Sequence, residues 1–117
     1  MRVIVAGSRG FNDYQKLCKT LDHLLCRYQP SEVEIVSGGA RGADTLGERY
    51  AKEKGCSLKI FPAEWDKFGK SAGYRRNVQM AEYSNGCVVF WDGKSKGAKH
   101  MIDIAEKYKL NLRKVIA

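Results

Sequence analysis

The segment VEIVSGGARGADTLGERYAKEKG, Val33 to Gly55, joins a strand pattern directly to a helix pattern through a glycine-rich turn. Val33 to Ser37 has the apolar alternation of a strand, and Ala43 to Lys54 predicts a helix. Glycines between the two elements let the backbone turn sharply and approach a ligand, and the helix start offers free N–H groups and its positive dipole end. A guanidinium in the turn adds two donors for a phosphate. We therefore predict a phosphate-binding loop formed by Ser37, Gly38, Gly39, Arg41 and Gly42.

Strand and helix patterns alternate along the rest of the chain. Further strands are expected at Val3 to Ala6, Leu58 to Phe61, Cys87 to Trp91 and Arg113 to Ile116. Further helices are expected after the capping residues Asn12 and Asp13, at Tyr74 to Tyr83 and at Gly97 to Lys109, with a long loop over Pro62 to Ser71. Five strands alternating with four helices predict a single α/β domain over residues 1–117, a three-layer sandwich with a central parallel five-stranded sheet.

Composition narrows the class of partner and the cell compartment. The formal charge of +8 indicates an anionic partner and leaves nucleic acid, nucleotide and acidic protein open. No apolar run is long enough to span a bilayer, and a strand pattern at the N-terminus fits neither a signal nor a transit peptide, so no membrane partner is expected. Four widely spaced cysteines and two histidines predict no metal site and no disulfide framework. We expect a cytoplasmic protein with reduced, mostly buried thiols and no cofactor.

Parallel sheets bind ligands beyond the carboxyl ends of their strands, where the strand order reverses. The loops after the first, second and fourth strands should therefore converge. The first of these loops is Gly7-Ser8-Arg9. The glycine lets a ligand approach the backbone closely, the serine offers a hydroxyl, and the arginine offers a planar guanidinium. A simple turn with a surface arginine explains it equally well.

Other polar residues are expected near the same carboxyl edge of the sheet, and most of them fit either a structural role or a contact with a ligand. Asp44 in a first helical turn either stabilises the helix dipole or contacts a ribose hydroxyl. Arg75, Arg76 and Asn77 lie in the first turns of the third helix. Adjacent helical side chains point about 100° apart, so one of the two arginines faces the cleft and the other is a surface charge. Asn77 contacts either a base or the backbone. Trp65 packs in the core or stacks on a ligand, and Trp91 is a second stacking candidate. The fourth loop offers amide donors, a hydroxyl and a carboxylate from Asp92, Gly93, Ser95 and Gly97.

Missing motifs remove several enzyme classes. The chain has no G-x-x-x-x-G-K-[ST], so a Walker-type NTPase is not expected. No G-x-G-x-x-G follows the first strand, which argues against a nicotinamide dehydrogenase, and no G-x-S-x-G elbow is present.

Four motifs together resemble the YspA/YpsA-related branch of the SLOG superfamily, which joins the DNA-processing protein DprA to the LOG enzymes. They are GSRGFND, SGGARGAD, FPAEWDKFGKSAGYRRNVQM and FWDGKSKGAKHMI, in the family's order. The resemblance implies a Rossmann-like fold, a nucleotide or nucleotide-derived ligand such as an ADP-ribose-like or cyclic nucleotide signal, a homodimer, and a phage or bacterial source.

LOG enzymes cleave the N-glycosidic bond of nucleoside 5′-monophosphates with an arginine in an R-x-x-x-M helix and a glutamate after a glycine-rich turn. Arg76 and Met80 match the first pattern, whereas His100 stands where the glutamate would be. Without that carboxylate the mechanism loses the group that stabilises a developing oxocarbenium ion.

Three hypotheses follow. The first is a binder that senses or sequesters a nucleotide-derived small molecule. The second is a LOG-like phosphoribohydrolase that uses Asp44, Asp92 or His100 instead of the glutamate. The third is a DprA-like single-stranded DNA binder, which the positive charge permits.

Overall fold

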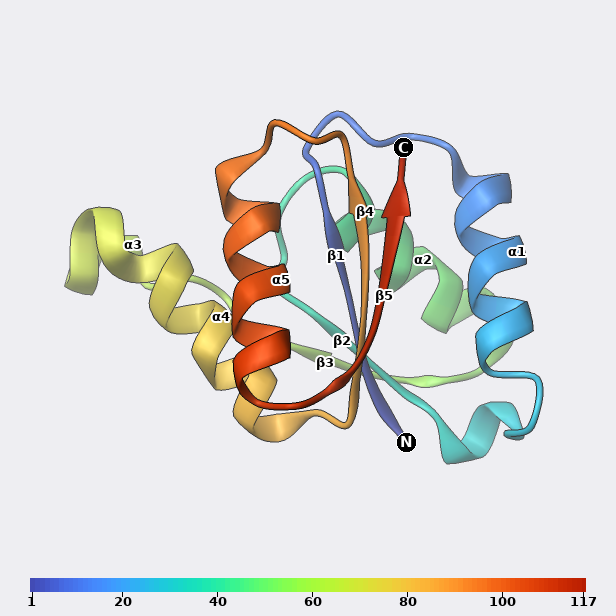
Figure 1. Cartoon of the computed structure of the whole chain (residues 1–117). Helices are drawn as coiled ribbons and strands as arrows, with labels where there is room; N and C mark the ends of the chain where they lie inside the picture. The colour runs from blue at the N-terminus through green and yellow to red at the C-terminus, as the bar shows by residue number, and fades with distance from the viewer.

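Five parallel strands form one sheet in the order β3-β2-β1-β4-β5 in the computed structural model, which describes residues 1–117. Their bounds are β1 Arg2–Gly7, β2 Glu34–Ser37, β3 Ser57–Ile60, β4 Gly86–Trp91 and β5 Asn111–Ile116. The chain builds outward from β1 to β3 on one side and from β4 to β5 on the other. The N-terminus lies at the lower edge of the sheet in Figure 1 and the C-terminus at the upper edge, where the strands end.

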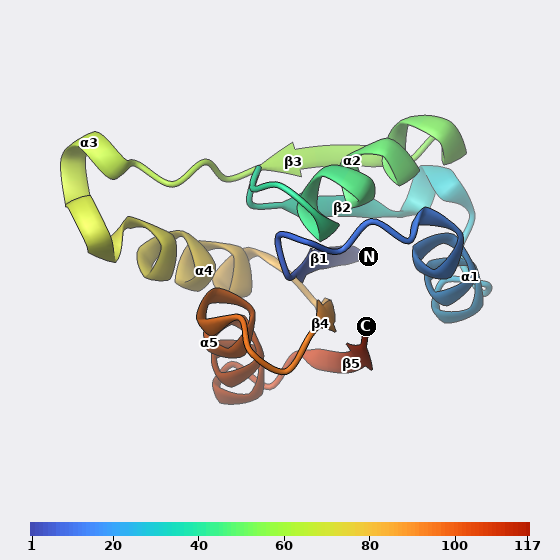
Figure 2. The ribbon, with the colours of Figure 1, turned by 90° about the horizontal axis from the view of Figure 1, so that it is seen from above.

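Helices cover both faces of this sheet, which gives the three-layer Rossmann-like α/β sandwich predicted from the sequence. Helices α1 (Tyr14–Leu24) and α2 (Ala43–Lys54) lie on one face, and α4 (Ala72–Tyr83) and α5 (Lys96–Lys107) lie on the other (Figure 2). The short helix α3 (Trp65–Phe68) extends away from the body of the domain in the same view. Two 3₁₀ turns, η1 (Pro30–Glu32) and η2 (Gly69–Ser71), complete the elements.

The alternation of side chains along β1 divides the core into two halves. Val3 and Val5 pack with α1 and α2, whereas Ile4 and Ala6 pack with α4 and α5. All four side chains are buried, because a central parallel strand is covered on both faces. The central strands are thereby held rigidly, and the loops at their carboxyl ends start from fixed positions.

Two expectations from the sequence are wrong in detail. The connection expected as a loop over Pro62 to Ser71 contains α3 and η2, and α4 begins two residues before the expected Tyr74. A four-residue helix has no apolar repeat, so periodicity could not show it. All four cysteines are free, as expected, but only Cys87 is buried, because Cys18 and Cys56 are partly exposed and Cys26 is exposed.

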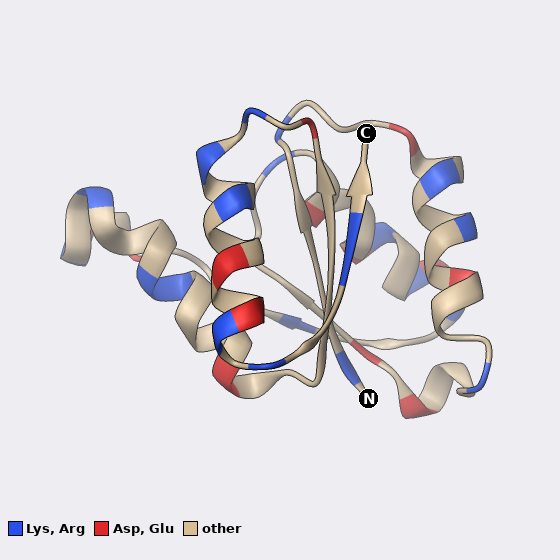
Figure 3. Cartoon of the chain, viewed as in Figure 1, with Lys and Arg blue, Asp and Glu red and all other residues tan.

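Charged side chains are distributed over the whole molecule. Lys and Arg occur on α1, α4, α5 and β5, interspersed with Asp and Glu on the helices, and form no continuous strip (Figure 3). None of the helices combines the length and the apolar composition that crossing a bilayer requires.

Candidate functional site

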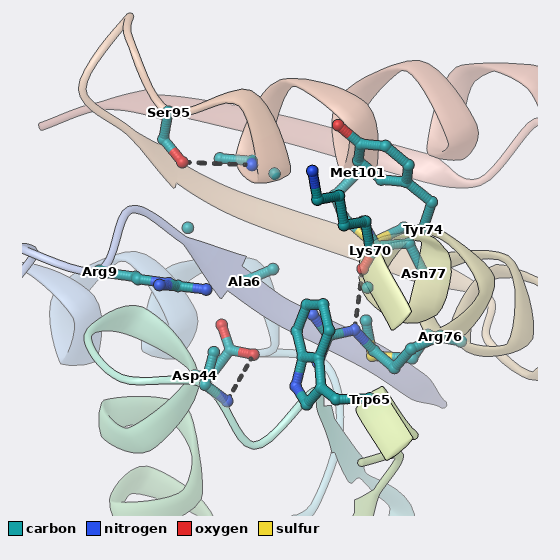
Figure 4. A pocket seen from close by; sticks show the side chains of 16 residues that line it. Ala6, Arg9, Asp44, Trp65, Lys70, Tyr74, Arg76, Asn77, Ser95 and Met101 are labelled. Carbon is teal, nitrogen blue, oxygen red and sulfur yellow. Dashed lines mark hydrogen bonds between the residues drawn. The ribbon is translucent and has the colours of Figure 1, made fainter. Parts of the chain in front are cut away.

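A cleft of about 300 Å³ opens at the carboxyl end of the sheet, where the strand order reverses between β1 and β4. Its walls come from the end of β1, the loop before α2, the segment from α3 to α4, and the start of α5 (Figure 4). The loops after β1, β2 and β4 therefore meet at one place, as the strand pattern predicted.

The cleft brings together one part of the residues proposed from the sequence and leaves out the other. The proposed residues that line it are Gly7, Arg9, Asp44, Trp65, Arg76, Asn77, Ser95 and Gly97. The proposed residues outside its lining are Ser8, Ser37, Gly38, Gly39, Arg41, Gly42, Trp91, Asp92 and Gly93.

The glycine-rich loop between β2 and α2 is closed by a carboxylate of the same chain. Asp44 Oδ2 accepts hydrogen bonds from the backbone N–H groups of Gly38 at 3.1 Å and Ala40 at 3.4 Å. The N–H of Gly39 donates to Ser37 Oγ, whose own hydroxyl donates to Glu48. A phosphate bound by these amides would have to replace internal acceptors. Arg41 is exposed and lies outside the cleft.

Gly38 and Gly42 lie in close contact with other groups of the protein, so a side chain at either position would displace its neighbours. A Cβ on Gly38 would lie 2.5 Å from Arg76 Nη1 and 2.8 Å from Asp44 Oδ2. A Cβ on Gly42 would lie 2.3 Å from the carbonyl oxygen of Ser8, and the φ of +82° at Gly42 also favours glycine. These two glycines bring the loop after β2 against α4 and against the loop after β1.

Burial changes the protonation of Asp44, which is only 4% exposed. Burial raises the pKa of Asp44 to about 6, although the Arg76 charge and the amides of Ala40 and Gly38 act in the opposite direction. Asp44 is also the only carboxylate residue in the lining of the cleft. It is therefore ionised for the most part at neutral pH and protonated in mild acid.

Arg76 on α4 connects this loop to α5. Its guanidinium donates to the carbonyl oxygen of Gly38 through Nη1 and to Asn77 Oδ1 through Nε. With Oδ1 so occupied, Asn77 presents Nδ2 as a donor to His100 Nδ1 at 3.1 Å. Burial lowers the pKa of His100, which agrees with a neutral ring that accepts at Nδ1. The His100 ring packs against Tyr74 at a tilt of 41°, with ring centroids 4.3 Å apart, and does not line the cleft.

The loop between β4 and α5 satisfies most of its own polar groups. Asp92 Oδ1 accepts from the N–H groups of Lys94 and Ser95, both at 2.8 Å, and these bonds lower the pKa of Asp92. The N–H of Asp92 donates to the buried Ser8 hydroxyl, which ties this loop to the loop after β1. Trp91 Nε1 donates to the Ser95 carbonyl oxygen, and the ring packs against the core beside α5. Ser95 caps α5.

Cationic side chains exceed carboxylates in the cleft. Arg9, Lys70 and Arg76 line it, and none of the three lies within 4.0 Å of a carboxylate oxygen. Burial lowers the pKa of Arg76, the nearby Asp44 charge raises it, and the charge of Arg9 lowers it to a smaller extent. Asp44 is the one carboxylate residue beside three cationic side chains, and an anion in the cleft would balance the remaining positive charge.

Aromatic side chains border the cleft on its outer side. Trp65 at the start of α3 is 52% exposed and lines the cleft, so it is not a core residue. Its ring lies over Gly73, where a Cβ would come 3.4 Å from Trp65 Cη2. Tyr74 and Lys70 also line the cleft and were not proposed from the sequence. Lys70 lies in η2, outside α4, so no helical repeat in the sequence links it to Tyr74 or Arg76.

The fold and this site define a class: a Rossmann-like α/β domain with a basic, aromatic-bordered cleft at its strand switch point. Residues 1–68 match the family model described as YspA, cpYpsA-related SLOG family. The Gene 61 protein of Mycobacterium phage D29 is 34% identical in an alignment 112 residues long that covers 91% of this chain and 89% of the phage protein. The chain belongs to the YspA, cpYpsA-related SLOG family, as its motifs predicted.

A solved structure supports the same fold. The DNA processing protein A (DprA) of Streptococcus pneumoniae superposes with a TM-score of 0.75 over 97% of this chain, at 20% sequence identity. The match covers 49% of DprA, so this chain spans about half the length of that protein.

Proposed function

We propose that the cleft binds a nucleotide or nucleotide-derived small molecule, and that the protein acts by sensing or sequestering this ligand. The observation that carries the proposal is the convergence of Arg9, Lys70 and Arg76 without ion-pair partners beside the exposed ring of Trp65. Guanidinium groups suit phosphate oxygens, and an exposed indole suits a base. A volume of about 300 Å³ is at the lower end of small-molecule sites.

Ligand capture tests the class of ligand. The protein is incubated with pooled nucleotides, cyclic dinucleotides and ADP-ribose derivatives, washed and denatured, and the released compounds are identified by mass spectrometry. An intact nucleotide-derived compound is expected. Capture of no compound from this pool would contradict the proposal.

A pair of neighbouring arginines tests the site itself. Arg76→Ala should weaken binding of the captured compound about 10- to 100-fold, because a charge-assisted contact is lost. Arg75→Ala is the matched control, since Arg75 is exposed, contacts Ser71 and the Phe68 ring, and does not line the cleft. Unchanged affinity in Arg76→Ala, or equal losses in both variants, would exclude this cleft as the site.

A LOG-like phosphoribohydrolase is a second candidate, favoured by Asp44. Of the three residues considered as substitutes for the missing glutamate, Asp44 alone lines the cleft, whereas Asp92 and His100 do not. In the reaction, water adds across the N-glycosidic bond and yields free base and ribose 5-phosphate. Incubation with AMP followed by chromatography tests this activity. If the wild-type protein releases adenine and Asp44→Asn does not, the protein is an enzyme and not only a binding protein.

Single-stranded DNA binding is a third candidate, favoured by the formal charge of +8. The fold similarity to a DNA processing protein is consistent with it, although at 20% identity the similarity concerns the fold alone. Binding through several phosphates should weaken by about 10³-fold or more between about 50 and 200 mM salt. An oligothymidylate titration at these two salt concentrations therefore separates a DNA site from a single-nucleotide site.

A further inference from the structure

Asp44 has one oxygen that the protein does not use. Oδ2 accepts the amides of Gly38 and Ala40, whereas Oδ1 accepts no hydrogen bond from any residue. The residue is 4% exposed and lines the cleft. Figure 4 shows the carboxylate held from below through one oxygen, with the other oxygen directed into the cleft beneath Arg9. Ser84 Oγ is the buried side-chain atom that lacks a partner, so solvent reaches Asp44 Oδ1 from the cleft. A donor on a ligand can take the place of that solvent and form a charge-assisted hydrogen bond.

The surroundings of Asp44 restrict what this donor is. A phosphate carries no donor when it is fully ionised and would be repelled by the carboxylate. A metal ion needs further ligands, and no group of three or more His, Cys, Asp or Glu residues is present to hold one. The partner of Oδ1 is therefore an uncharged or cationic donor, such as a hydroxyl or an amino group.

The order of groups along the cleft favours a sugar hydroxyl. Asp44 lies close enough to Arg76 for the two charges to interact, and Arg9 lies above it in Figure 4. If these arginines hold a phosphate and Trp65 holds a base, the intervening ribose lies next to Asp44. An amino group of the base would lie farther out, on the side of Trp65.

We infer that Asp44 Oδ1 accepts a hydrogen bond from the vicinal hydroxyls of a ribose, so that the cleft selects ribonucleotides over 2′-deoxyribonucleotides. This inference rests on the proposed binding function. It adds a sugar specificity that the basic residues of the cleft cannot supply, because they contact phosphate identically in the two ligand classes.

The test compares affinity ratios instead of single affinities. AMP and ADP-ribose, each beside its 2′-deoxy analogue, are titrated into the protein by calorimetry. The wild-type protein should bind the ribose forms about 10- to 100-fold more tightly, as expected for a hydrogen bond to a charged group. In Asp44→Asn, the side-chain oxygen must face the amides of Gly38 and Ala40, so an NH₂ group replaces the acceptor and the ratio should fall below about threefold.

Removal of the negative charge also strengthens phosphate binding in Asp44→Asn, but it does so equally for both sugars, so the ratio cancels this effect. The control is Asp92→Asn, which removes a carboxylate outside the cleft and should keep the wild-type ratio.

Equal affinity for ribose and deoxyribose forms in the wild-type protein would overturn the inference and leave the binding function intact. If neither ribose form binds, the inference and the nucleotide-binding function fail together. A ratio unchanged in a folded Asp44→Asn variant would assign Asp44 a structural role only.

Discussion

Substitution of Gly38 by alanine should separate the binding role of Arg76 from the stability of the fold. The new Cβ would lie 2.5 Å from Arg76 Nη1, 2.8 Å from Arg76 Cζ and 2.8 Å from Asp44 Oδ2. Contacts this short cannot persist, so the Arg76 guanidinium and the Asp44 carboxylate must both shift. The guanidinium moves farther, because it lies at the end of a flexible side chain, whereas Asp44 is buried and accepts the Gly38 amide. The backbone of Gly38 does not have a positive φ, so alanine fits its conformation.

The substitution should cost moderate stability and also weaken binding of the ligand. A displaced Arg76 loses its hydrogen bond to the Gly38 carbonyl oxygen, worth about 1.5–3 kcal/mol for a charged donor. The loss of backbone freedom in the unfolded chain returns about 0.4–1 kcal/mol when glycine becomes alanine. The net destabilisation is therefore about 1–2 kcal/mol. A ligand phosphate loses the Arg76 contact altogether, which weakens binding about 10- to 100-fold.

Gly39→Ala is the matched control for this prediction. Gly39 has a φ of +73°, which costs an alanine about 1–2 kcal/mol, but its Cβ would meet only Ile60 Cγ2 at 3.4 Å. The two variants should thus lose similar stability in urea titrations, while calorimetry with the captured ligand shows weak binding in Gly38→Ala alone. The reasoning is refuted if Gly38→Ala binds within about twofold of the wild type, or if both variants lose affinity equally.

Two further substitutions test the chemistry of the cleft. Burial raises the pKa of Asp44 from 3.8 to about 6, so the folded protein binds a proton at Asp44 more tightly than the unfolded chain does. Protonated Asp44 therefore stabilises the fold fully below about pH 4, and this contribution, about 3 kcal/mol, is lost as the pH rises through 6. Urea unfolding of Asp44→Asn should therefore show a gain over the wild type that grows between about pH 4 and pH 7; a constant difference would contradict it. Trp65→Ala should change the unfolding free energy by less than about 0.5 kcal/mol, since the ring is 52% exposed. It should weaken AMP binding about fivefold or more through lost stacking and leave ribose 5-phosphate binding unchanged, as titration of both compounds would show.

The layers of the fold were predictable because central parallel strands carry a distinctive pattern. Val3 to Ala6 and Cys87 to Trp91 are apolar without interruption, and only strands covered on both faces need such runs. Once the strands are known, right-handed crossovers bring the loops after β1, β2 and β4 to one edge. Arg9 and Asp44 could be placed at the cleft for this reason, because they follow β1 and β2.

The segment from α3 to α4 could not be predicted to the same extent. Trp65 and Lys70 belong to elements of four and three residues, which are too short to show a repeat. Their positions depend on how this segment leaves β3 and returns to α4, a tertiary property that local sequence does not contain. Tyr74 was assigned to a helix, but its exposure at the cleft depends on the same geometry.

The glycine-rich turn shows why a motif indicates a geometry before it indicates a ligand. Gly38 and Gly39 do form a tight turn between a strand and a helix, but acceptors of the same chain already bind its amides. The amides of Gly38 and Ala40 donate to Asp44, two residues after Gly42, and the amide of Gly39 donates to Ser37 Oγ. The carboxylate of Asp44 supplies the negative charge that the turn and the helix start favour. Arg76 donates to the carbonyl oxygen of the same Gly38 residue, so the turn positions a carboxylate and a guanidinium at the floor of the cleft. An acidic residue in the first turn of the helix therefore changes the expectation for such a loop: its amides orient a side chain of the protein, and that side chain, with the neighbouring guanidinium groups, faces the ligand.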